Sequence, residues 1–149
     1  MNSDKNLIYL VCNFVKNDSR VLKVAVSAQK SKLNVTIIGF QNKENKILTE
    51  KYLGTKLILF PQKYLLEIIH AIAWNKPLFQ IIQKTNIWRY LKGKEIIYSH
   101  DILGLIVIAY CQRILALENI YIPWIHDCHE YMYGSYLYFK KIGNKEKEN

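Results

Sequence analysis

Short runs of consecutive apolar residues recur along the chain, and segments with helical spacing separate them. Three of these runs are apolar throughout and do not alternate with polar residues, which is typical of strands in a sheet that is covered on both faces. Strands that alternate with helices favour a parallel sheet with crossover helices. The predicted fold class is therefore α/β, an open parallel sheet with helices on both faces.

The pattern predicts the following elements in chain order. They are a strand over 7–13, a helix that begins near Asn17 and ends near Lys32, a strand over 33–40, one or two short strands within 46–60, a helix over 62–75, a helix over 77–91, a strand over 95–99, a helix over 101–117 and a strand over 120–125. Neither an internal repeat nor a linker divides the chain. We predict one domain over 1–142 and a disordered, charged tail over 143–149.

Composition narrows the classes of protein to which the chain can belong. Lys and Arg outnumber Asp and Glu by 21 to 12, and the net charge of +9 favours anionic partners. The lysines are dispersed and no nucleic-acid-binding motif occurs, so no nucleic-acid partner is predicted. The cysteines Cys12, Cys111 and Cys128 are widely spaced and odd in number, which indicates reduced thiols and a cytoplasmic location. The longest apolar stretch, 102–111, is about half of the ~20 residues that a membrane span needs.

Polar side chains gather where three of the predicted strands end. They are Asn13, Lys16, Asn17, Asp18, Ser19 and Arg20 after the first strand, His100 and Asp101 after the strand over 95–99, and His126, Asp127, His129 and Glu130 after the strand over 120–125. Ligands of open parallel sheets bind at the carboxyl ends of the strands. The three groups therefore predict a binding site along one edge of the sheet.

Each group also has a purely structural interpretation. The turn from Asn17 to Arg20 opens a helix, whose free N–H groups can bind an anion, or Asp18 and its neighbours simply cap that helix. Asp101 fits the N-cap of the helix that follows it, which leaves His100 to hydrogen-bond a ligand. The glycine motifs of dinucleotide sites and of P-loops are both absent from the sequence.

The segment from His126 to Glu130 has the densest set of reactive side chains. No metal site is predicted there, because adjacent residues of a strand point to opposite faces and HExxH is absent. A general base is the alternative, with His129 oriented by Asp127 or Glu130. A polar strand end with incidental histidines fits the same residues. Cys128 lacks the glycine pattern of a nucleophile elbow, so cysteine catalysis is not predicted.

Three of these segments together resemble bacterial glycosyltransferases of family 4. The run from Asn17 to Lys23, with 34–38 after it, resembles their opening "DSRVLKEA" helix and the strand that follows. Ser99-His100-Asp101 resembles their "HAHD" segment, and Asp127-Cys128-His129-Glu130 resembles their "D-x-HE" segment. The matches occur in the family's order and span about Leu7 to Tyr133.

The resemblance implies a Rossmann-like domain that forms the N-terminal, acceptor-side half of a GT-B fold. It implies His129 as the catalytic residue, which hydrogen-bonds the donor sugar or the reaction centre. The substrate-binding residues that it implies are Asn17, Asp18, Ser19, Arg20, His100, Asp101, Asp127 and Glu130. No metal and no cofactor are implied, and a nucleotide-sugar acts as co-substrate on the C-terminal domain.

Two features of the sequence depart from the family pattern. The first loop, 13–17, has no glycine, although glycines in the family approach the donor phosphates there. The donor-binding half does not follow the fifth strand. We therefore expect a fragment, a truncated product or one subunit of a split enzyme, which is inactive until a C-terminal donor-binding domain or subunit joins it.

The expected function is to bind a glycan or a lipid-linked acceptor for sugar transfer in cell-envelope polysaccharide biosynthesis. The alternative is a non-catalytic accessory module with a Rossmann-like fold. Basic residues beside Trp and Tyr within 77–94, with Trp74 and Lys76 before it, also suit the interface of an anionic membrane. That segment predicts peripheral contact with the inner face of the cell membrane, or an ordinary amphipathic helix packed on the sheet.

Overall fold

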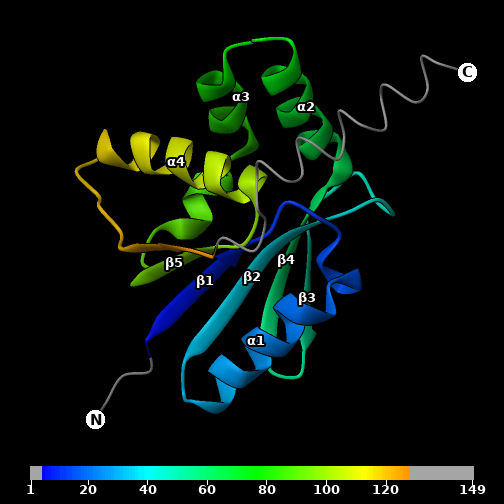
Figure 1. The fold of residues 1–149 in the computed structure, drawn as a ribbon, viewed down its shortest axis with the longest axis vertical. Coiled ribbons are helices and arrows are strands. Elements are labelled where there is room, and N and C mark those ends of the chain that lie inside the picture. The colour runs from blue at the N-terminus through cyan, green and yellow to red at the C-terminus, as the bar shows by residue number, and fades with distance from the viewer. Residues whose placement is uncertain (1–4, 128–149) are drawn as a thin grey trace, which may run out of the picture.

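The computed structural model describes residues 5–127, which form a sheet with helices packed against it (Figure 1). The elements are β1 (Asn6–Leu10), the 3-10 helix η1 (Val15–Asn17), α1 (Ser19–Lys30), β2 (Asn34–Gln41), β3 (Leu48–Tyr52), β4 (Thr55–Pro61), α2 (Gln62–Ala73), α3 (Leu78–Thr85), the 3-10 helix η2 (Ile87–Leu91), β5 (Ile96–Ser99), α4 (Ile102–Ala116) and β6 (Trp124–His126). The predicted tail, Cys128, His129 and Glu130 lie outside the described residues.

The six strands form one sheet in the order β3-β4-β2-β1-β5-β6. All neighbouring strands are parallel except β3 and β4, which are antiparallel. The five parallel strands, numbered along the chain, therefore lie in the order 3-2-1-4-5 of a doubly wound sheet. The predicted Rossmann-like α/β class is confirmed. The direction of winding reverses between β1 and β5, which is where such sheets bind ligands.

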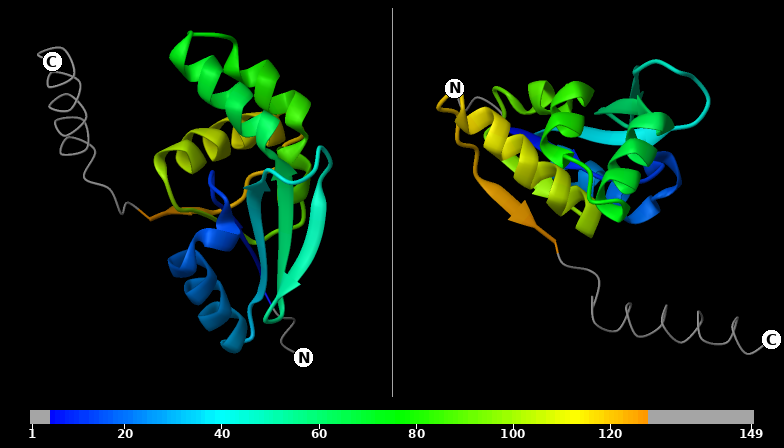
Figure 2. Two further views of the ribbon diagram at one scale, coloured as in Figure 1. Left: turned by 90° about the vertical axis from the view of Figure 1, so that its right-hand side faces the viewer. Right: turned by 90° about the horizontal axis from the view of Figure 1, so that it is seen from above.

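Helices cover both faces of the sheet, as the apolar strands predict (Figures 1 and 2). On one face, Val21, Leu22 and Ala25 of α1 pack with Tyr9 and Ile37 of the central strands. On the other face, α2, α3, η2 and α4 bury a larger cluster that includes alternate residues of the same strands. Each central strand is thus apolar on both sides because each side has its own core.

The segment between β2 and β4 differs from a typical doubly wound fold. Two adjacent parallel strands are usually joined through a helix, but here the chain forms β3, which returns antiparallel to β4. The turn between them uses Leu53 and Gly54 with positive φ angles of 46° and 86°. The sequence predicts one or two strands in this region without their direction. As a result, α1 has no second helix beside it over β4.

Three predicted elements are shorter than the sequence suggests, and the first is the strand over 7–13, which is found as β1. The helix over 77–91 divides into α3 and η2 at Asn86, which adopts a left-handed conformation with φ of 59°. The indole of Trp88 then donates to the carbonyl of Gln83 across the break. The strand over 120–125 is reduced to β6, because Pro123 has no N–H to donate to a ladder.

Gly39 of β2 packs closely against Val15 of η1. A Cβ atom at this position would lie 2.6 Å from Cγ1 and 2.8 Å from Cβ of Val15, which is fully buried. Gly39→Ala should therefore lower the free energy of unfolding by about 1–3 kcal/mol, as overpacking does. Urea denaturation followed by circular dichroism measures the loss. Because Val15→Ala removes the nearer contact, the double variant should lose less than the sum of the single losses. Additive losses would contradict this packing.

Candidate functional site

A cleft of about 280 Å³ lies at the carboxyl ends of β1 and β5, where the winding of the sheet reverses. Its polar lining residues are Cys12, Asn13, Asp18, Arg20, His100 and Asp101. Four of them, Asp18, Arg20, His100 and Asp101, are predicted from the sequence as site residues. The cleft therefore brings together two of the three strand-end groups.

Asp101 joins the two strands that border the cleft. One carboxylate oxygen accepts the N–H of Gly104 at 2.5 Å, and the other accepts the N–H of Cys12 at 3.1 Å. Asp101 is thus the N-cap of α4, as predicted, and it also ties α4 to the end of β1. A Cβ atom on Gly104 would lie 3.1 Å from the carbonyl oxygen of Leu10, so a small residue suits this contact.

Asp18 is the N-cap of α1. One oxygen accepts the N–H groups of Arg20 and Val21 at 3.2 Å each, and the other accepts the side-chain amide of Asn13 at 2.9 Å. Partial burial works to raise the pKa of Asp18. The hydrogen bonds from Asn13 and Val21, together with the nearby Arg20, outweigh it and lower this pKa below its ordinary value. Asp18 is therefore a charged helix cap.

Three further polar residues line the cleft. The Arg20 side chain is exposed, and Oδ1 of Asn13 is buried without accepting a hydrogen bond from another described residue. His100 is 8% exposed, and its ring packs edge-on against Tyr98 with centroids 5.7 Å apart. The first turns of α1 and α4 also open towards this cleft, and helix N-termini attract negative charge. Because Asp18 and Asp101 already cap these two helix starts with negative charge, the arrangement suits binding and orientation of hydroxyl groups.

The Cys12 thiol in the same cleft is not a nucleophile. Burial raises its pKa well above the ordinary value, and the neighbouring Asp101 and Cys111 raise it further. The thiol therefore stays protonated and packs as a small apolar group. The sequence places Asn13 at this edge of the sheet but does not select it as a binding residue, and it does not select Cys12 at all. The signal that could have found Cys12 is its position at the end of the first apolar run.

The third predicted group lies on a neighbouring hydrogen-bond network. The hydroxyl of Tyr98 donates to Asp127 at 2.7 Å, and burial together with the Asp127 charge raises the pKa of Tyr98. Ser99 accepts the indole N–H of Trp124 at 2.9 Å and hydrogen-bonds Nδ1 of His126 at 2.8 Å. These contacts fasten β6 to β5. Asp127 thus lies beside the cleft without lining it. The predicted residues His129 and Glu130 lie outside the described residues.

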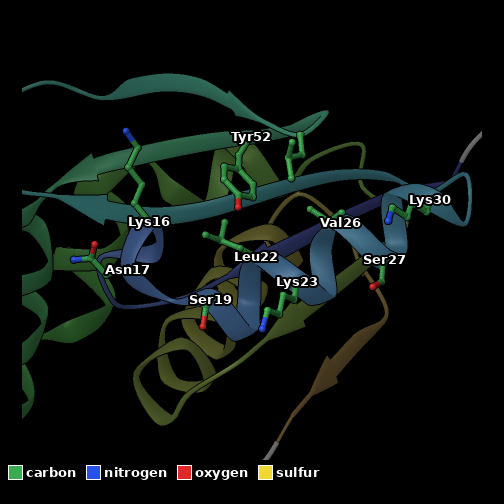
Figure 3. A pocket seen from close by; sticks show the side chains of 10 residues that line it. Lys16, Asn17, Ser19, Leu22, Lys23, Val26, Ser27, Lys30 and Tyr52 are labelled. Atoms are coloured by element: carbon green, nitrogen blue, oxygen red, sulfur yellow. The ribbon is translucent and has the colours of Figure 1, made fainter.

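Asn17 and Ser19 line a separate groove between α1 and the turn from β3 to β4 (Figure 3). The groove has a volume of about 560 Å³ and a rim of lysines, Lys16, Lys23 and Lys30. Lys16 forms an ion pair with Glu50. The groove occupies the place beside α1 that a second crossover helix would cover. The structure therefore divides the predicted turn between two hollows, with Asp18 and Arg20 on one side and Asn17 and Ser19 on the other.

Two further properties bear on the kind of site. Within residues 5–127, no three His, Cys, Asp or Glu side chains are placed to hold a metal ion together. Of the helices in that range, none has the length and apolarity to cross a bilayer.

Fold and cleft together define a Rossmann-like α/β domain with a hollow at its switch point. The chain matches no family model, and no curated protein or solved structure was found to be similar to it.

The two capping aspartates should respond differently to the same substitution. Asp101→Asn places an amide N–H against a backbone N–H, because both oxygens of Asp101 accept backbone donors. The free energy of unfolding should fall by about 2 kcal/mol, the contribution of hydrogen bonds to a charged group. Asp18→Asn should cost less, since Asn caps helices as well as Asp does and the amide of Asn13 can rotate. Equal losses in urea denaturation would contradict these roles.

Asp18 also predicts a pH dependence. Because its pKa is lowered in the folded chain, its charged form stabilises the fold above its unfolded pKa of about 3.9. This contribution is lost as the pH falls through the folded pKa. The stability of the native chain should therefore drop more steeply below about pH 4 than that of Asp18→Asn. Parallel stability curves from urea denaturation across this pH range would rule out the effect.

Proposed function

We propose that this domain binds the sugar-bearing end of a substrate in the cleft, as the acceptor-side domain of a GT-B glycosyltransferase. The observation that carries the proposal is the position of Arg20 and His100 at the switch point of a doubly wound sheet. Both residues belong to segments that resemble family 4 glycosyltransferases. The proposed acceptor is a glycan or a lipid-linked sugar at the cytoplasmic face of the membrane.

The polar groups of the cleft fit recognition of a sugar. The exposed Arg20 supplies hydrogen-bond donors, and the imidazole of His100 can donate or accept according to which nitrogen is protonated. The carboxylates of Asp18 and Asp101 both accept hydrogen bonds that hold the fold together. We therefore assign binding and orientation to this part of the site. The reactive role is proposed for His129, on the family resemblance.

The size of the cleft supports a site that two domains share. Its volume of about 280 Å³ lies just below the roughly 300–1,000 Å³ of complete ligand pockets. A donor-binding domain or subunit that closes over the strand ends would complete it and bind the nucleotide-sugar. In the proposed reaction the acceptor oxygen forms a bond to the anomeric carbon, the bond to the nucleotide diphosphate breaks, and the acceptor proton passes to a base. We propose no metal or cofactor for this step.

A non-catalytic accessory module is the second candidate. The observation that favours it is the structural use of both cleft carboxylates, which leaves neither free for proton transfer. Such a module would present the same fold and would bind neither sugar phosphates nor nucleotide-sugars.

Amide chemical shifts distinguish these two functions. Glucose 1-phosphate, galactose 1-phosphate and N-acetylglucosamine 1-phosphate are titrated into the isotope-labelled full chain. A sugar-binding cleft predicts saturable shifts at residues 12–13, 20 and 100–103 with at least one of them. Arg20→Ala should weaken that binding by roughly tenfold, the contribution of a charge-assisted hydrogen bond.

Lys30→Ala is the matched control, because it removes one cation from the separate groove. It should leave the titration unchanged. Absence of saturable shifts with all three sugar phosphates would overturn the proposed sugar site and favour the accessory module. Equal weakening by Arg20→Ala and Lys30→Ala would also overturn it, since binding would then follow net charge.

A further inference from the structure

Along α2 and the residue after it runs a stripe of large apolar side chains in contact with water. Leu66, Ile69 and Ile72 are 43%, 38% and 41% exposed, and Trp74, which directly follows the helix, is 73% exposed. We call these four residues the α2 stripe. The inner side of the same helix already packs into the core through Leu65, Ile68 and Ala71. Ile69 and Ile72 follow Leu65 and Ile68 by four residues, so they border this packed side and leave its edge in contact with water, whereas Leu66 and Trp74 lie farther from the core.

The stripe ends at a protruding part of the molecule. The loop that joins α2 and α3 lies at one end of the long axis, and Trp74 is part of this loop (Figures 1 and 2). Because α2 follows β4 directly, it begins at the carboxyl edge of the sheet, where the cleft also lies. An exposed apolar ridge on a protruding hairpin is typical of a surface that contacts another phase or partner.

The charges around the stripe favour an anionic partner. Lys63 lies at its start, Lys76 follows Trp74, and both are exposed. The range 62–85 contains three lysines, Lys63, Lys76 and Lys84, and one acidic residue, Glu67. Basic residues that flank exposed Trp and aliphatic side chains match the interface of an anionic bilayer, where the apolar groups enter and the cations remain at the headgroups.

The segment 77–94 contributes less to such contact than its sequence suggests. Ile82, Ile87 and Leu91 are fully buried and Trp88 is nearly so, as in the alternative of a helix packed on the sheet. The exposed apolar residues lie instead on α2, which precedes this segment. A protein partner would need a groove complementary in shape to this convex ridge. A lipid surface needs none, so a lipid partner fits the ridge better.

We propose that the α2 stripe, with Lys63 and Lys76, docks the domain on the surface of an anionic lipid bilayer. The three aliphatic residues and Trp74 enter the interfacial region, and the lysines contact acidic headgroups. The helix lies along the surface and does not cross it. This inference does not rest on the proposed function, because none of these residues lines the cleft.

Flotation of the full chain with vesicles tests the proposal. Vesicles of phosphatidylcholine with about one quarter phosphatidylglycerol should carry the protein at low ionic strength, and pure phosphatidylcholine vesicles should not. Trp74→Ser should reduce binding by roughly tenfold or more, because an aromatic side chain no longer leaves water. Tyr121→Ser is the matched control, since Tyr121 is 76% exposed in the segment between α4 and β6. It should bind as the native chain does.

Paired charge reversals separate local contact from general attraction. Lys63→Glu with Lys76→Glu should abolish flotation, whereas Lys23→Glu with Lys30→Glu, which changes the net charge equally, should preserve most of it. Unchanged melting temperatures show that each variant is folded. Failure of the native chain to float with anionic vesicles, or equal effects of the two pairs, overturns the proposal. The proposal is also overturned if the chain forms a dimer without lipid and Leu66→Ser dissociates that dimer, because a second copy would then cover the stripe.

Discussion

The carboxylate of Asp101 ties the end of β1 to the start of α4, at the point where the winding of the sheet reverses. It accepts one backbone N–H from the end of β1 and one from the first turn of α4. It adds to the β1–β5 ladder and to the packing of Val107, Ile108 and Cys111 against the end of β1. The cleft exists because these two backbone segments are held at this separation. Asp101, which the sequence predicts as a substrate-binding residue, thus stabilises the backbone that borders the cleft.

Much of the fold could be predicted from the sequence because its strands are apolar on both sides. Leu7 to Leu10 and Val35 to Phe40 leave no polar face for water, so both faces need helices, and the structure supplies them. The N-cap at Asp101 was equally readable, because an Asp before an apolar helical segment has few other local roles. Four predicted site residues share one cleft because strand ends in a parallel sheet meet at one edge.

Other features depend on contacts that a sequence does not display. The direction of β3 is set by its pairing with β4, and either direction fits the apolar pattern of 46–60. The break at Asn86 is accompanied by hydrogen bonds from Trp88 to Gln83 and from Ile87 to Thr85, which the helical spacing of the sequence does not display. Asn17 and Ser19 lie next to Asp18 in the chain, yet they face the groove because successive residues at a helix start point in different directions. Asp127 follows a strand end as predicted, yet it hydrogen-bonds Tyr98 and does not line the cleft.

The strand β6 is held less firmly than the central strands of the sheet. In the part of the chain that the structure describes, β6 has three residues and pairs with β5 alone. Its remaining support comes from side chains, Trp124 and His126 on Ser99 and Asp127 on Tyr98. Such a strand can detach and return while the central strands stay folded. Within residues 5–127, β6 is the outermost strand on its side of the sheet, so a surface that pairs with it would hold Asp127 in place.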